Sequence, residues 1–427
     1  MLRGKDAKDW DLATNAMPEE VLASFRDSKP KGFVIPTGIK HGTLTVHFKN
    51  RCMEITTYRS ESDYSDGRRP DEVNYVGTIE DDLSRRDFRM NAIALRLPAG
   101  MMIDPYNGEA DIEAGIIRCV GNPVERFSED GLRPLRALRF AAQFGFDIDE
   151  LTLEAIPLSL WVTALVSAER IRDELGKIIM SPFPSRIFRI MEDTGLLKLL
   201  LPELAACRNV EQKGLHRFDV LDHSLFACDY AAREQYPQET VLAALLHDIG
   251  KPLVREASGF DDAPWTFYRH EAESARLARI MLNRLKFPNA VIDSVCHLVE
   301  EHMFNYDDYW SNAAVRRFIV RAGEDSLENL YRLRRADAYA QAGIIPGADF
   351  LLPLIARVDR ELAGKNAFSL KDLAVKGKDL IELGIKPGKT MGMILNELFE
   401  TVLDDPAQNN REKLLSIAVN LAKKVLS

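Results

Sequence analysis

The sequence predicts an α+β fold, in which a strand-rich region at the start of the chain is followed by a long helical remainder. Residues 8–14, 32–50 and 51–59 carry the alternation of apolar and polar side chains that is typical of strands. Within 14–25 we predict a cap at Thr14 or Asn15 and a helix that begins at Pro18. From about residue 128 onward apolar residues instead recur every three or four positions, which is typical of amphipathic helices. At 427 residues and 46% hydrophobic, the chain is long enough for several separate cores.

Composition narrows the class of protein. No stretch approaches 18 consecutive apolar residues and no secretory leader pattern opens the chain, so we expect a soluble, cytoplasmic protein with no membrane partner. The five cysteines are scattered without a C-x-x-C pair, which argues against a disulfide framework and a zinc knuckle. The net charge of −9 counts against nucleic-acid binding, but a local basic surface can still hold a phosphate backbone.

Paired carboxylates mark the first strands. Asp9 and Asp11 are two residues apart, so on a strand both point to the same side. Glu54 alternates with apolar neighbours, and it either faces solvent or joins the aspartates as a third carboxylate. Carboxylate oxygens suit Mg²⁺, which takes one or two protein carboxylates together with substrate phosphates. The alternative is a polar strand end with solvated aspartates.

An arginine pair begins the next motif, within residues 82–97. Arg85, Arg86 and Asp87 precede a predicted apolar helix, and Asn91 follows Asp87 by four positions on the same helix face. Guanidinium groups bind phosphate through two parallel hydrogen bonds, while a carboxylate and an amide can hydrogen-bond a ribose. The alternative is a charged helix start. On either side of this motif we predict a polar loop over residues 60–81 and a strand pair with a turn over 102–123.

Residues 128–146 read as one amphipathic helix with its entry. Pro134 lies in the predicted first turn and Gly145 ends the helix. On the face opposite the apolar one, charged residues recur every three positions: Asp130, Arg133, Arg136 and Arg139. Such spacing often gives only solvated ion pairs, each contributing a few tenths of a kcal/mol.

Histidines concentrate in one helical region. Six of the eight lie between His216 and His302, which indicates a site rather than isolated core histidines. The residues that attract attention there, all on predicted helices, are His223, the adjacent pair His247 and Asp248, His270, His297, His302 and Asp337. Residues 341–427 are predicted to be helical, with lysines (386, 389, 423 and 424) that either contact phosphate or form a solvated surface.

Six motifs occur in an order and spacing that resembles the bacterial class II tRNA nucleotidyltransferase and poly(A) polymerase family. They are DWDLAT, RCMEITTYR, DGRRPDEV, DLSRRDFRMNA, DPYNGEADI and EDGLRPLRALRFAAQFGF. The resemblance implies a polymerase-beta-type nucleotidyltransferase head over 1–112, an all-helical neck over 113–200, a histidine-aspartate (HD) body over 201–345 and a tRNA-binding tail over 346–427. It also predicts that the chain begins inside the family's head, after a glycine-glycine turn that would contribute to triphosphate binding, which would put catalytic competence in question.

The resemblance also implies roles for the residues of the head and neck. Asp9 and Asp11, with Glu54, would hold Mg²⁺. Four residues match the motif that holds triphosphate and selects ribose: Arg85, Arg86, Asp87 and Asn91. Asp130 and Arg133 match the pair that chooses the incoming nucleotide, with Arg136 and Arg139 on the same helix. A carboxylate accepts from the amino group of cytosine or adenine and a guanidinium donates to the ring, whereas guanine and uracil present a carbonyl instead.

The histidine region resembles the HD metal-dependent phosphohydrolases. By that resemblance one divalent metal would be bound by His223, His247, Asp248 and Asp337, while His270 and His302 would serve a second metal or contact substrate phosphate. Imidazole with carboxylate favours a transition metal such as Ni²⁺ or Mn²⁺ over Mg²⁺.

The function implied is template-independent addition or repair of the 3′-terminal CCA of tRNA from CTP and ATP, with HD phosphatase or cyclic phosphodiesterase activity on damaged ends. The alternatives are a poly(A) polymerase, an enzyme that adds only CC or only A, and a catalytically silent tRNA-binding protein.

Overall fold

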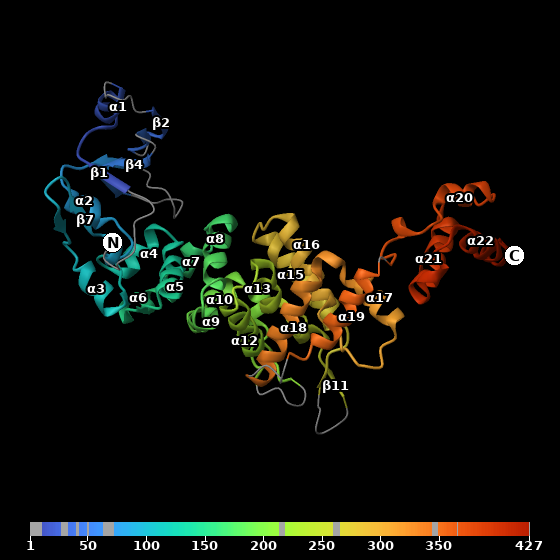
Figure 1. Cartoon of the computed structure of the whole chain (residues 1–427). Helices are drawn as coiled ribbons and strands as arrows, with labels where there is room; N and C mark the ends of the chain where they lie inside the picture. The colour runs from blue at the N-terminus through green and yellow to red at the C-terminus, as the bar shows by residue number, and fades with distance from the viewer. Residues whose placement is uncertain are drawn as a thin grey trace. The chain divides into compact units, whose positions relative to one another are not determined.

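The structure is a computed structural model, and it describes residues 11–26, 33–39, 42–48, 51–62, 72–212, 218–258, 265–343, 349–364 and 366–426. It divides into two compact units, and each is described by itself. The first comprises Met1–Ala206 with Met281–Phe287, and the second Cys207–Ile280 with Pro288–Ser427. The α+β prediction is confirmed, because the strands gather near the start of the chain and helices make up most of the remainder (Figure 1).

A four-stranded sheet opens the first unit, in the order β1-β4-β3-β2. The edge strand β1 runs parallel to β4, while β3 is antiparallel to both β4 and β2. A small core forms on this sheet from Val21, Leu44, Val46 and Ile55. The elements of this part are β1 (Asp11–Thr14), α1 (Pro18–Arg26), β2 (Phe33–Gly38), β3 (Thr43–Phe48) and β4 (Arg51–Thr57).

Short elements then lead into the helical part of the first unit. They are β5 (Arg59–Ser62), β6 (Glu72–Tyr75), α2 (Ile79–Ser84), a 3-10 turn (Arg89–Asn91), β7 (Ala94–Arg96), β8 (Met101–Ile103), α3 (Gly108–Ala114) and β9 (Ile116–Ile117). The helical part follows with α4 (Pro123–Glu129), α5 (Arg133–Phe144), β10 (Asp147–Ile148), α6 (Glu150–Leu158), α7 (Leu160–Thr163), α8 (Ala168–Ile179), α9 (Pro184–Asp193), α10 (Leu196–Leu200) and α11 (Pro202–Ala205).

The second unit is almost entirely helical. Its elements are α12 (Val220–Arg233), α13 (Gln238–Leu246), α14 (Lys251–Val254), β11 (Glu256–Ala257), β12 (Trp265–Thr266), α15 (His270–Arg284, of which the residues from Met281 belong to the first unit), α16 (Asn289–Glu301), α17 (Asn312–Ala322), α18 (Leu327–Ala342), α19 (Leu352–Ala363), α20 (Gly377–Glu382), α21 (Lys389–Asp404) and α22 (Arg411–Leu426). Helices α12, α13, α16 and α18 pack against one another. The last helices enclose a core of their own, which includes Leu380, Ile394 and Leu398.

Five sequence predictions of local structure were wrong, four of them between residues 32 and 123. Residues 32–50 contain two strands rather than one, and the predicted loop over 60–81 contains β5, β6 and the start of α2. The apolar helix predicted after Asp87, within 82–97, is absent: a 3-10 turn (Arg89–Asn91) and β7 take its place, and the preceding helix α2 ends at Ser84. Residues 102–123 contain α3, because the carboxylate of Asp104 accepts hydrogen bonds from the backbone of Gly108 and Glu109 and so caps a helix.

The predicted single helix over 128–146 is in fact two, α4 and α5, with Asp130 in an extended conformation between them. Close packing causes the break. A Cβ on Gly131 would lie 2.5 Å from the carbonyl oxygen of Val162, and the hydroxyl of Thr163 donates to the Gly131 carbonyl at 2.9 Å. Tertiary contact therefore overrides a local pattern that is helical on both sides.

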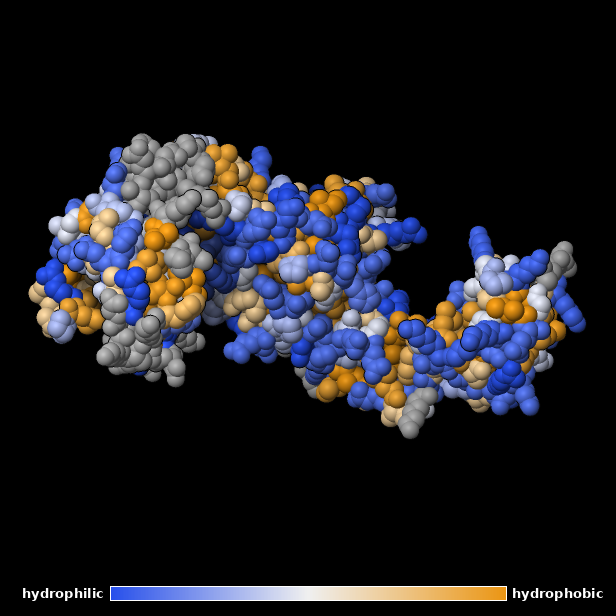
Figure 2. All heavy atoms as spheres, turned by 90° about the horizontal axis from the view of Figure 1, so that it is seen from above, coloured by the Kyte–Doolittle hydropathy of each residue, from blue (hydrophilic) through white to orange (hydrophobic). Residues whose placement is uncertain are grey.

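Hydrophilic side chains cover much of the face shown in Figure 2, with hydrophobic patches between them. Among the described residues, no helix combines the length and the apolar character needed to cross a membrane.

Candidate functional site

Two of the three predicted strand carboxylates are neighbours. Asp11 on β1 is in register with Glu54 on the parallel strand β4, so both side chains leave the same face of the sheet. Both are exposed, which leaves their oxygens accessible. Asp9 lies outside the described residues. A pair of adjacent, accessible carboxylates offers the hard oxygen ligands that Mg²⁺ prefers.

A cavity of about 520 Å³ lies beside this pair in the first unit. Its lining includes Asp11, Arg86, Asn91 and Arg96, so a carboxylate faces the same space as two guanidinium groups. The Nε of Arg86 is buried and has no hydrogen-bond partner among the described residues. An unsatisfied buried donor at a cavity wall favours an anionic ligand.

Asp82 positions the two arginines. Its buried carboxylate accepts from Nε and Nη2 of Arg85 at 3.0 and 2.9 Å, and it lies 3.4 Å from Nη2 of Arg86. It also accepts from the backbone N–H of Arg59 at 3.2 Å. Sequence analysis did not identify Asp82 as a functional residue, although its spacing of three and four residues from the arginines on a helix start is a usable signal.

Asp87 is buried and fully engaged within the protein. One oxygen accepts from Nδ2 of Asn91 and from the backbone N–H of Phe88, each at 2.9 Å, and the other accepts from Nε of Arg136 at 2.7 Å. Burial alone would raise the pKa of the Asp87 carboxyl, but the charge of Arg136 and these hydrogen bonds together hold it below its usual value. The predicted pairing of Asp87 with Asn91 is therefore present, although a 3-10 turn and not the predicted α-helix connects them.

The arginines of α5 are not a solvated face. Arg133 and Arg139 are buried, and Arg136 contacts Asp87. Arg133 donates to Glu129 and to the backbone carbonyls of Arg126 and Arg85. The solvated alternative is therefore wrong for these side chains.

Arg139 ties α5 to α8. Its Nε donates to Glu174 at 2.5 Å, and its guanidinium lies 3.7 Å from the centre of the Phe140 ring. Burial lowers the pKa of Arg139, and Glu174 opposes that shift.

Asp130 and Arg133 have separate side-chain partners. The carboxylate of Asp130 accepts from Nη2 of Arg170 on α8 at 2.7 Å and from the backbone N–H of Leu132 at 3.0 Å. Arg133 is held by Glu129, a residue that sequence analysis did not assign. Each member of the predicted base-selecting pair is thus oriented by a partner of opposite charge.

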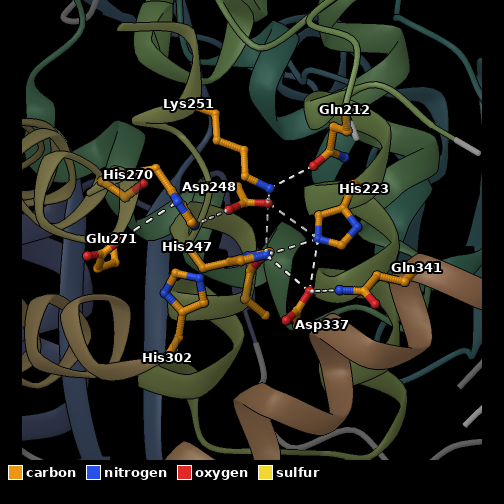
Figure 3. A network of polar contacts seen from close by, with 12 residues as sticks. Gln212, His223, His247, Asp248, Lys251, His270, Glu271, His302, Asp337 and Gln341 are labelled. Carbon is orange, nitrogen blue, oxygen red and sulfur yellow. Dashed lines mark hydrogen bonds and ion pairs between the residues drawn. The ribbon is translucent and has the colours of Figure 1, made fainter. Parts of the chain in front are cut away.

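The second unit gathers the predicted histidines and aspartates into one buried cluster (Figure 3). Nε2 of His223 lies 3.0 Å from Nε2 of His247, 3.4 Å from Oδ2 of Asp248 and 3.2 Å from Oδ1 of Asp337. Nε2 of His270 lies 3.3 Å from Oδ1 of Asp248. His297 is elsewhere, bonded to the carbonyl of Ala322.

Three of these histidines are oriented in the same way. His247, His270 and His302 each place Nδ1 at 2.7–2.9 Å from the backbone carbonyl three residues earlier. Donation from Nδ1 leaves the lone pair on Nε2, which is the form that binds a metal, and it fixes the ring orientation. Burial and the charge of His247 lower the pKa of His302 to about 3, so this ring is neutral.

The aspartates of the cluster stay ionised although they are buried. Burial raises the pKa of a carboxyl, but the charges of His247 and Lys251 hold the pKa of Asp248 well below its usual value. Lys251 lies 2.6 Å from Oδ2 of Asp248 and donates to Gln212 at 2.7 Å. Ionised carboxylates beside imidazole nitrogens form a donor set that fits a divalent transition metal.

Two groups of described residues have the geometry to hold a metal ion. One contains His223, His247 and Asp248, and the other contains Asp248, His270 and His302. Asp337 is adjacent to the first group and receives hydrogen bonds from Arg334 and Gln341. Sequence analysis named all of these metal-binding candidates but assigned no role to Lys251, Gln212 or Gln341.

Family models cover three parts of the chain. Residues 1–118 match the poly A polymerase head domain, residues 145–208 match an RNA- and SrmB-binding site of polymerase A, and residues 261–418 match tRNA nucleotidyltransferase domain 2. Together with the in-register carboxylates and the basic cavity, these matches define a nucleotidyltransferase with a polymerase-beta-type head and a helical body.

Relatives narrow the class further. The chain is 32% identical over 417 residues to the CCA-adding enzyme of Geobacillus stearothermophilus, covering 97% of this chain and 89% of that protein. It is 31% identical over 419 residues to the CCA-adding enzyme of Enterococcus faecalis, covering 98% and 88%. The crystal structure of the Bacillus stearothermophilus CCA-adding enzyme in complex with CTP superposes with a TM-score of 0.70 at 28% identity, covering 99% of this chain and 90% of that one. The chain belongs to the family of CCA-adding enzymes.

Proposed function

We propose that this protein adds the 3′-terminal CCA of tRNA from CTP and ATP without a nucleic-acid template. In each step the 3′ hydroxyl of the tRNA attacks the α-phosphorus of the nucleotide, a new P–O bond forms, and pyrophosphate leaves. The observation that carries the proposal is the register of Asp11 with Glu54 beside a cavity that also contains Arg86. Magnesium ions, held by Asp11 and Glu54 and, as the family resemblance implies, by Asp9, would activate the hydroxyl and stabilise charge on the triphosphate.

The residues of the cavity would bind the nucleotide. Arg85 and Arg86, presented by Asp82, offer guanidinium N–H groups to the triphosphate. Asn91 lines the cavity and is bonded to Asp87, so the two can present a fixed hydrogen-bonding edge to the ribose. Their rigidity would lower the cost of ordering the site when the nucleotide binds.

Base choice would fall to Asp130 and Arg133. The carboxylate accepts from the exocyclic amino group shared by cytosine and adenine, and the guanidinium donates to a ring acceptor. Uracil and guanine would place a carbonyl oxygen against the carboxylate, and an unpaired polar contact of this kind is rejected strongly. Arg170 and Glu129 would hold the two side chains in place.

One incubation tests the function and its alternatives. tRNA lacking its last three nucleotides is mixed with the protein, Mg²⁺, and labelled CTP and ATP. We expect CCA to be added and synthesis then to stop. A run of A would indicate a poly(A) polymerase, CC alone or A alone a partial enzyme, and no incorporation with retained tRNA binding a silent tRNA-binding protein. Each of these outcomes would replace the proposal.

A second function is supported by the buried histidine-aspartate cluster. We propose that the second unit is an HD phosphohydrolase that removes terminal or 2′,3′-cyclic phosphates from tRNA ends before extension. A divalent metal held by His223, His247, Asp248 and Asp337 would lower the pKa of a bound water. Lys251, 2.6 Å from Asp248, would place a positive charge beside the phosphate. Hydrolysis forms a bond from the water oxygen to phosphorus, breaks the ester bond and leaves the ribose hydroxyl.

The phosphohydrolase has its own test. The full chain, freed of metal by chelation and then supplied with Ni²⁺ or Mn²⁺, is assayed with a 2′,3′-cyclic phosphate. We expect turnover that His247→Ala abolishes and that His297→Ala, a change in a histidine outside the cluster, leaves intact. Equal activity in both variants would overturn this proposal.

We also propose the four-part organisation given by the sequence, with head, neck, HD body and tRNA-binding tail. It is supported by the end of α10 at Leu200 and by the division of the chain into two compact units after Ala206. The lysines at 386, 389 and 423 remain candidates for phosphate contact.

A further inference from the structure

We infer that strand β7 and the residue after it bind the single-stranded 3′ end of the tRNA, with Arg96 contacting a phosphate group and Leu95 and Leu97 contacting a base. This inference rests on the nucleotide addition proposed above, and it names residues that receive the second substrate. The cavity of about 520 Å³ beside Asp11 carries the inference, because Leu95, Arg96 and Leu97 all line it.

The two substrates of the proposed reaction need separate contacts in this cavity. The 3′ hydroxyl and the α-phosphorus must meet beside Asp11, where the metal ions would lie. In an in-line displacement the hydroxyl approaches from the side opposite the leaving pyrophosphate. The cavity residues proposed for the nucleotide, Arg86 and Asn91, come from the segment between α2 and β7. Strand β7 lines the same cavity and has no role in nucleotide binding, so it is available to the RNA end.

Arg96 offers a positive charge to this cavity. Its side chain is exposed, and no carboxylate in the part of the chain that the structure describes pairs with it. Burial raises the pKa of Tyr58, and the charge of Arg96 opposes that rise, so the guanidinium lies close to the phenol. Tyr58 lines the cavity as well. A guanidinium and a phenol hydroxyl at one cavity wall can both donate hydrogen bonds to a phosphate group.

The apolar side chains around Arg96 favour an RNA end over a triphosphate. Leu95 is 48% exposed and Leu97 is 64% exposed. Met102 on β8 lies directly opposite Leu95 and is 40% exposed, so it extends the apolar surface on the same face of the hairpin. A triphosphate has no apolar group to pack there. A single strand instead places its bases on aromatic and apolar side chains while cations hold its backbone.

The salt dependence of tRNA binding tests the inference without relying on activity. tRNA that ends in CC is bound to the full chain in the absence of nucleotide, and Kd is measured by fluorescence anisotropy at several salt concentrations. Each phosphate neutralised on a single strand contributes about 0.7 to the slope of log Kd against log salt concentration. We therefore expect Arg96→Met to reduce the slope by about 0.7 and to weaken binding about fourfold near physiological salt.

Two further arginine variants serve as controls for the binding measurement. Arg96→Lys keeps the positive charge and should keep the slope. Arg51→Met removes an exposed arginine of β4 that does not line the cavity, so it should change neither the slope nor Kd. A slope that Arg96→Met leaves unchanged would overturn the phosphate contact.

Steady-state addition of A to the same tRNA separates the two sources of phosphate. We expect Arg96→Met to raise the KM for tRNA and to leave the KM for ATP unchanged. Leu97→Ser, at a side chain too exposed to support the core, should raise the KM for tRNA without changing the salt slope of binding. A raised KM for ATP with an unchanged KM for tRNA would assign Arg96 to the triphosphate and overturn the inference.

The outcomes separate this inference from the proposed function. If the parent adds A and the Arg96 and Leu97 variants behave like it, the RNA-end site is overturned and nucleotide addition stands. If the parent adds nothing but Arg96→Met still reduces the salt slope of tRNA binding, nucleotide addition is overturned and the RNA-end site stands. A parent that adds nothing, with an unchanged slope in Arg96→Met, overturns both.

Discussion

At the residue scale, the side chains that we propose to bind the nucleotide in the first unit are held by other residues of the protein. Asp87 takes hydrogen bonds from Asn91, Phe88 and Arg136, and Asp130 takes one from Arg170. Because these side chains are already held in place, nucleotide binding does not carry the entropic cost of ordering them. The consequence is that the positioning residues should affect nucleotide binding and stability without touching the nucleotide.

Arg136→Met is expected to lower the free energy of unfolding by about 2 kcal/mol near neutral pH, because it leaves the buried Asp87 carboxylate without its cation. The pKa of Asp87 is lowered in the fold, so this stabilisation is present above the ordinary carboxyl pKa of about 4 and is lost as the pH falls through the folded value. Urea unfolding across the acidic range measures it. The difference in the free energy of unfolding between the parent and Arg136→Met should shrink below about pH 4. A difference that stays constant across the acidic range would contradict the pairing of Arg136 with an ionised Asp87. Lys198→Met, at an exposed position, serves as the control.

Arg170→Met is expected to raise KM for CTP and ATP and to reduce the selectivity of the enzyme for these nucleotides over UTP and GTP. Loss of a charged hydrogen bond to Asp130 corresponds to a decrease in kcat/KM of about tenfold or more. Steady-state kinetics with all four nucleotides measures the effect. Arg172→Met changes a neighbouring arginine of α8 that bonds instead to Asp173, so it should leave selectivity unchanged. A pure loss of kcat with unaltered selectivity would argue against the positioning role.

At the element scale, the extended break between α4 and α5 places Asp130. Gly131→Ala would bring a Cβ to 2.5 Å from the Val162 carbonyl oxygen, so the backbone must shift. We expect a loss of about 1–3 kcal/mol and a raised KM for nucleotide. Thermal unfolding and kinetics measure the two effects. Gly77→Ala, where the added Cβ meets no atom within 4 Å, should be nearly neutral. Equal behaviour of the two variants would show that the close packing is unimportant.

This break also shows what the sequence could and could not predict. Strand alternation is a local signal, so β1 and β4 were found, and with them the neighbouring carboxylates Asp11 and Glu54. The break at Gly131 is imposed by Val162, which is distant in sequence, so periodicity alone merged two helices into one. The short elements between residues 60 and 123 were missed for a related reason, since they are too brief to establish a period.

The candidate sites were predicted unevenly. The concentration of histidines in one region of the sequence indicated where the histidine-aspartate cluster lies. The resemblance to the HD phosphohydrolases then named its members. The residues that orient the functional side chains carry a weaker signal, such as the spacing of three and four residues between Asp82 and the arginine pair. Asp82 and Glu129 look like ordinary helix-end acids in the sequence, and only the fold shows that they hold Arg85 and Arg133. Which oxygen of Asp248 faces which histidine is likewise a property of tertiary packing.

At the scale of the whole molecule, the two proposed activities occupy separate units and should be separable. Asp11→Asn is expected to reduce nucleotide addition by about a thousandfold or more, because it removes a metal-binding oxygen, while phosphohydrolysis stays intact. His247→Ala should do the reverse. Parallel assays on the same preparations measure both. If either variant lost both activities while circular dichroism showed an unchanged fold, the two units would not act independently.

The arginines of α5 have a consequence for how this chain can change over evolutionary time. Arg133 contacts the backbone at Arg85, Arg136 contacts Asp87, and Arg139 contacts Glu174. Side chains of one helix therefore bond to three other positions in the chain. A helix turns about 100° per residue, so inserting or deleting a single residue among these arginines would swing at least one of them away from its partner. Point substitutions in α5 remove one contact and leave the others. We therefore expect the length of this segment to be far less variable than its composition.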